Sequence, residues 1–204
     1  MLVGVLDYGS GNFGSVWNAL EYLEVNKVRI DTPEQLPEVS HIVLPGVGTF
    51  PAAMRRLESL NLVQPLHEEV ITKKKLFLGI CVGMQILAGK GSEFEECDGL
   101  SYINGRVDKI EIETADLPLP HMGWNEIELN TESPLFRDLD ADPSFYFVHS
   151  FSFRASNLSD VIATCQYGNK VVAAVQRDNI FGVQFHPEKS QRNGLKLLKN
   201  FSEL

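Results

Sequence analysis

Residues 76–85, Leu-Phe-Leu-Gly-Ile-Cys-Val-Gly-Met-Gln, decide the fold of this chain. The apolar run at 76–80 is typical of a buried strand, and Gly79 to Gly83 then match the strand–turn–helix pattern G-x-S-x-G with Cys81 in the place of serine. Such a sharp turn lifts the central side chain above the sheet edge, and the flanking glycines leave room for a crowded backbone. Cys81 is therefore a candidate nucleophile. The alternative is a small, buried apolar residue.

The residues after Cys81 predict a helix over 82–87 whose N-terminus points at the sulfur. Unpaired N–H groups at a helix start favour thiolate over thiol. The amide of Val82, next after the nucleophile, is placed to donate to an oxyanion. A second donor is sought in Pro45-Gly46-Val47-Gly48, which ends an apolar strand and carries two flexible glycines; the alternative is a simple loop.

The order of the other elements predicts an α/β fold. Strands are expected at 2–6, 28–30, 41–44 and 76–80, with helices at 15–24 and 62–72. This alternation is typical of a parallel sheet covered by helices on both faces. Later strands are expected at 107–112, 124–129, 145–148, 161–166, 171–176 and 181–185, followed by a helix at 191–201. We predict a single domain over residues 1–204, with a mostly parallel central sheet flanked by helices and an antiparallel β annex in the C-terminal half.

The composition excludes several classes of protein. Of 204 residues, 44% are hydrophobic and 22% charged, an ordinary globular balance. The net charge of -9, spread along the chain, argues against a nucleic-acid-binding face. No apolar run approaches the ~18 residues that a membrane span needs. Three cysteines without a Cys-x-x-Cys pair argue against zinc and against a disulfide framework, so we expect a cytoplasmic protein without a metal.

A nucleophilic thiolate needs a base, and the base needs an orienting group. Of the five histidines, His186 is the best candidate because Glu188 follows it in a His-Pro-Glu stretch. Residues two apart share a face in extended backbone, so the Glu188 carboxylate can support the ring. Taken alone this stretch favours a surface turn, but together with the cysteine turn it predicts a Cys81–His186–Glu188 triad. Cys97 and Cys165 are expected to be structural.

The first Gly-rich turn has a competing interpretation. Residues 9–14, Gly-Ser-Gly-Asn-Phe-Gly, follow a strand and fit the dinucleotide pattern G-x-G-x-x-G, with Asp31 as a candidate ribose ligand. The triad accounts for more residues, so the nucleotide site is the disfavoured alternative.

Six stretches in this order make the chain resemble the class I glutamine amidotransferases of the triad type. They lie at 8–12, 44–48, 79–85, 120–125, 146–150 and 182–190. The cysteine turn and the His-Pro-Glu stretch are shared by many amidotransferases. The stretches His-Met-Gly-Trp-Asn at 121–125 and Tyr-Phe-Val-His-Ser at 146–150 are similar, more narrowly, to the glutaminase subunits of imidazole glycerol phosphate synthase.

This resemblance implies an activity and a partner. Glutamine would be hydrolysed to glutamate, and the ammonia would pass to a (β/α)8-barrel cyclase subunit within a heterodimer. The cyclase would form imidazole glycerol phosphate for histidine biosynthesis. No metal or organic cofactor is implied.

The resemblance also implies residue roles. Cys81 would attack the glutamine amide, His186 would transfer protons, and Glu188 would orient His186. The amides of Gly48 and Val82 would hold the oxyanion. The substrate-binding residues would be Gln85, Glu93, His149, Ser150 and Phe151, the last standing where tyrosine is more usual. The residues of the partner interface and its coupling would be Asn12, His121, Trp124, Asn125, Tyr146 and Lys189.

Other functions share parts of this pattern. A related glutaminase that supplies ammonia for surface-sugar amination is one alternative, and a stand-alone cysteine hydrolase on the same turn is another. An inactive regulatory module would normally lack the cysteine or histidine, and both are present. A glutaminase subunit for pyridoxal phosphate synthesis is disfavoured by Lys189 and by the stretch at 121–125.

Overall fold

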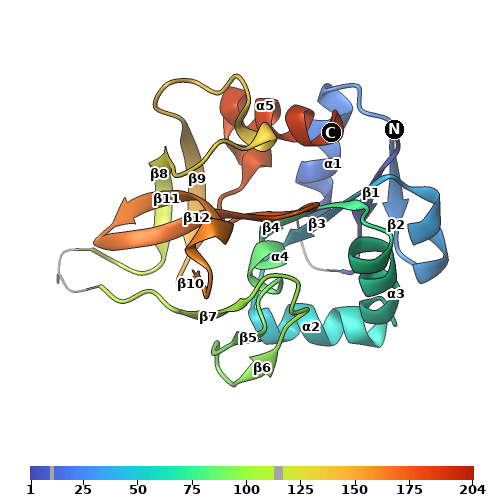
Figure 1. Ribbon diagram of the computed structural model, residues 1–204, viewed down its shortest axis with the longest axis horizontal. Helices are drawn as coiled ribbons and strands as arrows, with labels where there is room; N and C mark the ends of the chain where they lie inside the picture. The colour runs from blue at the N-terminus through green and yellow to red at the C-terminus, as the bar shows by residue number, and fades with distance from the viewer. Residues whose placement is uncertain (10–11, 113–116) are drawn as a thin grey trace.

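The computed structural model describes residues 1–9, 12–112 and 117–204 (Figure 1). In these ranges the α-helices are α1 (Phe13–Tyr22), α2 (Phe50–Ser59), α3 (Val63–His67), α4 (Val82–Gln85) and α5 (Gln191–Ser202). The strands are β1 (Val3–Leu6), β2 (Lys27–Ile30), β3 (His41–Gly46), β4 (Leu76–Cys81), β5 (Lys90–Gly91), β6 (Cys97–Asp98), β7 (Gly105–Lys109), β8 (His121–Leu129), β9 (Ser144–His149), β10 (Phe151–Ala155), β11 (Val161–Tyr167), β12 (Asn169–Arg177) and β13 (Ile180–Val183). A π-helical turn (Glu68–Thr72) continues α3, and 3-10 helices span Pro33–Glu38, Pro134–Phe136, Leu158–Asp160 and Pro187–Lys189.

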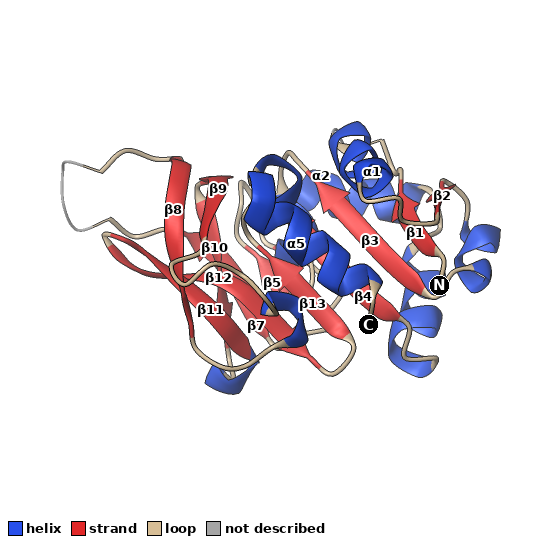
Figure 2. Ribbon diagram, turned by 90° about the horizontal axis from the view of Figure 1, so that it is seen from above, coloured by secondary structure: helices blue, strands red, loops and turns tan. Residues whose placement is uncertain are grey.

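The central sheet has two kinds of pairing. Its strand order is β2-β1-β3-β4-β13-β12-β11-β8-β9, which Figure 2 shows from above. The pairs from β2 to β13 are parallel, and those from β13 to β9 are antiparallel. This confirms the predicted α/β class, the parallel core and the antiparallel C-terminal strands. The carboxyl end of β4, where Cys81 lies, is flanked by parallel neighbours, which is the usual place for a site in such sheets.

Helices cover both faces of the parallel part. In Figure 1, α1 and α5 lie on one face, and α2, α3 and α4 lie on the other. Each long helix turns an apolar stripe to the sheet, as α5 does with Leu197, Leu198 and Phe201. Strands β1, β3 and β13 are buried along their whole length, as expected for strands covered on both faces.

A smaller sheet lies beside the central one, with the order β10-β7-β5-β6. Sequence patterns did not predict β10, because it follows β9 after a single residue, Ser150, and the two strands form one polar-apolar run. The chain changes sheets at this residue. Residues 149–151 therefore stand where the two sheets meet.

The helix after Cys81 is shorter than predicted. α4 ends at Gln85, whereas the pattern predicted a helix to residue 87. The carbonyl of Ile86 accepts from the amide of Leu100 at 2.8 Å, and that of Leu87 accepts from Tyr102 at 2.9 Å. These long-range bonds replace the helical ones. No helix in the described ranges has the length and apolar character needed to cross a membrane.

Candidate active site

The turn at Cys81 is backbone-strained. Its φ of 55° and ψ of -111° place a non-glycine residue in a sparsely populated region. Such a conformation costs about 1–3 kcal/mol and persists where the surroundings impose it, often at functional sites. A Cβ on Gly79 would lie 2.3 Å from the carbonyl oxygen of Gly83, and one on Gly83 would lie 2.1 Å from that of Leu44. Both glycines are therefore required by the close approach of the backbone.

His186 and Glu188 form a buried pair. Nδ1 of His186 donates to Oε1 of Glu188 at 2.7 Å, and both side chains are fully buried. The predicted contact is present, but Glu188 lies in the 3-10 turn Pro187–Lys189 and not in extended backbone. The side-chain amide of Asn12 also donates to Glu188 Oε1, so Asn12 supports the pair directly.

The charge of this pair is set by its neighbours. Burial lowers the pKa of His186, but the Cys81 sulfur and the Glu188 carboxylate together raise the pKa to about 10. His186 Nε2 forms no hydrogen bond with the described residues. A ring charged through its neighbours, with one nitrogen left for a ligand, suits a group that gives and takes protons.

A small cavity of about 190 Å³ brings most of the predicted site together. It is lined by Val47, Gly48, Cys81, Val82, Gln85, Glu93, Val148, His149, Ser150, Phe151 and His186. Both predicted oxyanion residues and all the predicted substrate-binding residues are among them. Glu188 is not, because it lies behind the His186 ring.

Gln85 and Glu93 enter the cavity from different elements. The Glu93 carboxylate accepts from the amide of Phe50, at the start of α2, at 2.9 Å, and burial raises its pKa. Gln85 Nε2 donates to the carbonyl oxygen of Phe151 at 3.0 Å and to Oε1 of Gln184 at 3.1 Å. Both hydrogens of the Gln85 amide are used inside the protein, so only its oxygen could contact a substrate.

A chain of hydrogen-bonded polar side chains extends from the cavity toward β8. Nδ1 of His149 contacts the Phe151 carbonyl at 2.8 Å, and its Nε2 contacts Nδ1 of His121 at 3.0 Å. Nε2 of His121 then contacts the Asn125 amide at 3.2 Å. Burial lowers the pKa of His149 to about 3 and that of His121 to about 4, so both rings are neutral at pH 7. Since a carbonyl only accepts, each hydrogen bond points from Asn125 toward Phe151.

The predicted interface residues separate onto two faces of β8. Trp124 is half exposed and pairs in register with Tyr146, 6.4 Å away between ring centroids, and Lys189 lies over the Tyr146 ring. His121 is 2% exposed. Successive side chains in a strand point to opposite faces, which turns His121 and Asn125 inward. The side chain of His121 is therefore buried within this chain, and half-buried Asn125 bonds inside the protein. The roles predicted for both residues in the partner interface and its coupling stay predictions.

Sequence reasoning missed Gln184. This residue is fully buried, and its Nε2 lies 3.7 Å from the Cys81 sulfur as a hydrogen-bond donor. It stands one residue after β13, beside the end of β4. Its presence in the stretch at 182–190 was a signal, but a glutamine inside a strand pattern does not show what it contacts.

The other cysteines have different surroundings. Burial, followed by Glu58 and Glu95, raises the pKa of Cys97, and burial raises that of Cys165 to about 12. A thiol with a raised pKa is a poor nucleophile at neutral pH. Among the described residues no group of three or more His, Cys, Asp or Glu side chains could hold a metal ion. Gly11 of the glycine pattern that suggested a nucleotide site lies outside those residues.

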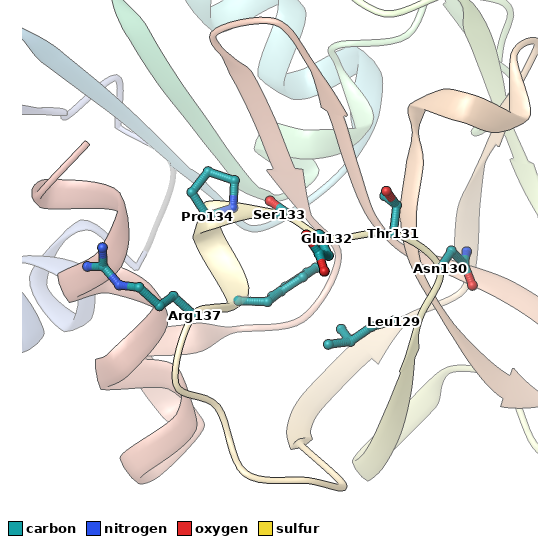
Figure 3. A pocket seen from close by; sticks show the side chains of 8 residues that line it. Leu129, Asn130, Thr131, Glu132, Ser133, Pro134 and Arg137 are labelled. Carbon is teal, nitrogen blue, oxygen red and sulfur yellow. The ribbon is translucent and has the colours of Figure 1, made fainter.

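A larger hollow, of about 810 Å³, lies away from this chemistry. Figure 3 shows it at the end of β8 and the short helix that follows. It is lined by Leu129, Asn130, Thr131, Glu132, Ser133, Pro134, Phe136 and Arg137. None of them lines the Cys81 cavity, so size does not identify the site here.

Comparison with known proteins identifies the family that the sequence motifs indicated. The family Glutamine amidotransferase class-I matches residues 4–203. Imidazole glycerol phosphate synthase subunit HisH 1 of Campylobacter jejuni is 44% identical over 203 residues, and subunit HisH of Pelagibacter ubique is 42% identical over 208, each covering 100% of both chains.

Solved structures share the fold. One described as a glutamine amidotransferase has a TM-score of 0.76 at 19% identity and covers 99% of both chains. The structure of PurLQS from Thermotoga maritima has a TM-score of 0.76 at 18% identity, covering 98% of this chain and 96% of that one.

The chain belongs to the class I glutamine amidotransferase family. Within this family it is a member of the HisH group, the glutaminase subunits of imidazole glycerol phosphate synthase in histidine biosynthesis.

Proposed function

We propose that Cys81, His186 and Glu188 carry out the glutaminase reaction of this subunit. The Cys81 thiolate, whose proton is held by His186, attacks the side-chain amide carbon of glutamine. His186 returns that proton to the departing nitrogen, which leaves as ammonia, and a thioester remains. His186 then takes a proton from water, which attacks the thioester and releases glutamate. The amides of Gly48 and Val82 stabilise the oxyanion, each worth about 3 kcal/mol.

The single observation that carries this proposal is the meeting of a strained turn and a buried pair at one cavity. The turn presents Cys81, and the His186–Glu188 pair stands beside it with Nε2 without a partner among the described residues. Strain and buried charge are costly, and both concentrate at functional sites. A structural cysteine would need neither.

The substrate contacts are proposed from the polar groups that line the cavity and are not used in the mechanism above. The Glu93 carboxylate and the Gln85 oxygen face a ligand as acceptors, which suits the ammonium group of L-glutamine. His149, Ser150 and Phe151 also line the cavity. The cytoplasmic location expected from the sequence stays a prediction.

The proposed partner is a (β/α)8-barrel cyclase subunit, which receives the ammonia within a heterodimer. The supporting observation is a partly exposed apolar patch formed by Trp124, Tyr146 and Met122, with Lys189 at its edge; the Met122 side chain is 62% exposed. Single exposed apolar residues are common, but clustered aromatic side chains are enriched at interfaces. Asn12 donates to Glu188, which directly precedes Lys189 in the chain, so the catalytic pair and the edge of this patch lie on adjacent residues.

The test uses the chain with and without the barrel subunit and its nucleotide substrate. We expect glutamine hydrolysis to be near background in the isolated chain, to rise when both are added, and to vanish in Cys81→Ala. Trp124→Ala should uncouple glutamate release from imidazole product, while Leu158→Ala, at another exposed apolar residue, should not. Full activity of the isolated chain, unchanged by the barrel, would favour a stand-alone cysteine hydrolase instead.

A further inference from the structure

We propose that Gln184 is a further catalytic residue, whose side-chain amide donates a hydrogen bond to the Cys81 sulfur and stabilises its thiolate form. The inference rests on the proposed role of Cys81 as the nucleophile. It gives a chemical task to a buried polar side chain that the mechanism above does not use.

The position of Gln184 is determined by the sheet. Its backbone amide donates to the Ala173 carbonyl at 2.8 Å, which holds the residue against β12 just past the end of β13. Because β13 pairs with β4 in parallel, the residues after Val183 run beside the turn at Cys81. The Gln184 side chain is 0% exposed, so its polar atoms must find partners inside the protein.

The orientation of the Gln184 amide follows from its neighbours. The Phe151 carbonyl can only accept, so Gln85 must turn its nitrogen toward it. The same nitrogen reaches Gln184 with its second hydrogen, and Gln184 must therefore present its oxygen there. The NH2 group of Gln184 then faces Cys81, where Nε2 lies 3.7 Å from the sulfur.

A second contact holds this arrangement in place. The Phe151 carbonyl also accepts from Nδ1 of His149 at 2.8 Å, so its two lone pairs serve His149 and Gln85. His149 in turn is held by His121. A hydrogen-bond chain thus runs from His121 to the Cys81 sulfur, and no amide in it can rotate without breaking a bond.

The sulfur has a particular need for such a donor. Cys81 is 4% exposed, and a buried thiolate loses most of its hydration. α4 has only four residues, too short to contribute much as a dipole. A hydrogen bond to a charged acceptor is worth more than one between neutral groups, corresponding to about 10- to 100-fold in the thiolate equilibrium. If Gln184 only filled space, the ionisation of Cys81 would not depend on its amide.

The experiment measures Cys81 alkylation by iodoacetamide between pH 5 and 10, read by peptide mass spectrometry in the complex with the barrel subunit. Gln184→Met removes the donor at similar length, and Gln184→Glu replaces it with an oxygen acceptor. We expect both to move the midpoint of the Cys81 profile to higher pH by about one unit, Glu more than Met, and to lower kcat for glutamine about tenfold or more. The control is Gln176→Met. Gln176 lies on β12 and accepts a hydrogen bond from Ser133, so its replacement should leave the Cys81 profile unchanged.

Two outcomes would overturn the proposal, and each is distinct from a failure of the glutaminase assignment. One is a Cys81 profile unmoved in either folded variant. The other is a profile moved equally by Gln176→Met. The two replacements could destabilise the fold for different reasons. Gln184→Glu buries a carboxylate, whereas Gln184→Met leaves the amide of Gln85 without its oxygen acceptor. If one variant unfolds, the other still tests the proposal. A wild-type complex that hydrolyses no glutamine, while Cys81 still alkylates with the expected profile, would reject the proposed reaction and leave the Gln184 contact standing.

Discussion

The parallel and antiparallel halves of the central sheet contribute to the site in different ways. In the parallel half, one strained turn at the end of β4 positions Cys81, and the turn itself is formed by the consecutive residues from Gly79 to Gly83. In the antiparallel half, His121 and His149 meet only because β8 and β9 pair in register across 28 positions of sequence. The nucleophile is therefore a local feature of the backbone, and the wall of its pocket is a product of long-range pairing.

The energetic consequences differ in the same way. The local turn stores backbone strain, which the surrounding glycines make tolerable. The antiparallel wall stores no such strain but buries two neutral imidazoles whose hydrogen bonds must all be satisfied. Substitutions in the first region should change chemistry or backbone packing, whereas substitutions in the second should change the response to pH.

The largest effect is expected at Cys81. Cys81→Ala should lower kcat by about 10⁴-fold or more, because no other thiol lines the cavity. Cys81→Gly should be equally inactive but about 1 kcal/mol more stable toward urea than Cys81→Ala, since glycine tolerates the observed φ of 55°. Equal stability of the two variants would contradict the view that the turn is strained.

The next effect is expected at Glu188. Glu188→Gln removes the carboxylate that raises the pKa of His186, so the imidazolium form loses stabilisation. We expect kcat to fall about 10²- to 10⁴-fold and the limb assigned to His186 in the pH–rate profile to move to lower pH. Glu203→Gln removes a surface carboxylate paired with Arg137 and is the control. A rate loss without any movement of the profile would mean that Glu188 acts through packing alone.

The two halves also differ in what could be predicted from sequence. The turn at Cys81 and the His186–Glu188 pair were predicted because each signal lies within a few residues. The end of α4 was predicted wrongly, because the carbonyls after it bond to residues 100–103. The contact of Gln184 with Cys81 also spans many positions of sequence, and β10 was missed because it continues the run of β9.

The motif at 121–125 did not show which of its side chains are exposed. A motif shows that residues 121–125 belong together, but the alternation of a strand sends His121 and Trp124 to opposite faces. Contacts between residues close in the sequence could thus be predicted, whereas the faces and pairing partners of strand residues could not.

A third prediction tests the close packing of the turn. Gly79→Ala should destabilise the fold by about 2–4 kcal/mol, because its Cβ would lie 2.3 Å from the Gly83 carbonyl oxygen, a backbone atom with little freedom to move. Gly14→Ala is the matched control, since nothing lies within 4 Å of its Cβ in α1 and alanine favours a helix by about 1 kcal/mol. Urea unfolding of both variants measures the difference. A Gly79→Ala variant as stable as Gly14→Ala would refute the packing argument.

The smallest effect concerns the pH response of the antiparallel wall. Burial lowers the pKa of His149 to about 3 and that of His121 to about 4, from the ordinary histidine value of 6.5. The unfolded chain therefore binds protons below about pH 6.5 that the folded chain refuses. Stability from this source is complete above that pH and is lost as the pH falls toward 4, by about 2 kcal/mol per histidine at pH 5.

His121→Asn separates this effect from the rest of the protein. Asparagine cannot titrate, and its amide retains a donor near the position of Nδ1, toward His149. Between pH 7 and 5, the free energy of unfolding should fall by about 2 kcal/mol less in this variant than in the wild type. His41, whose pKa is also lowered by burial, is present in both chains and cancels. His67→Asn, at an exposed position, should keep the wild-type response. If His121→Asn kept it too, His121 would gain its proton over the same pH range in the folded and unfolded chains, and burial would not lower its pKa.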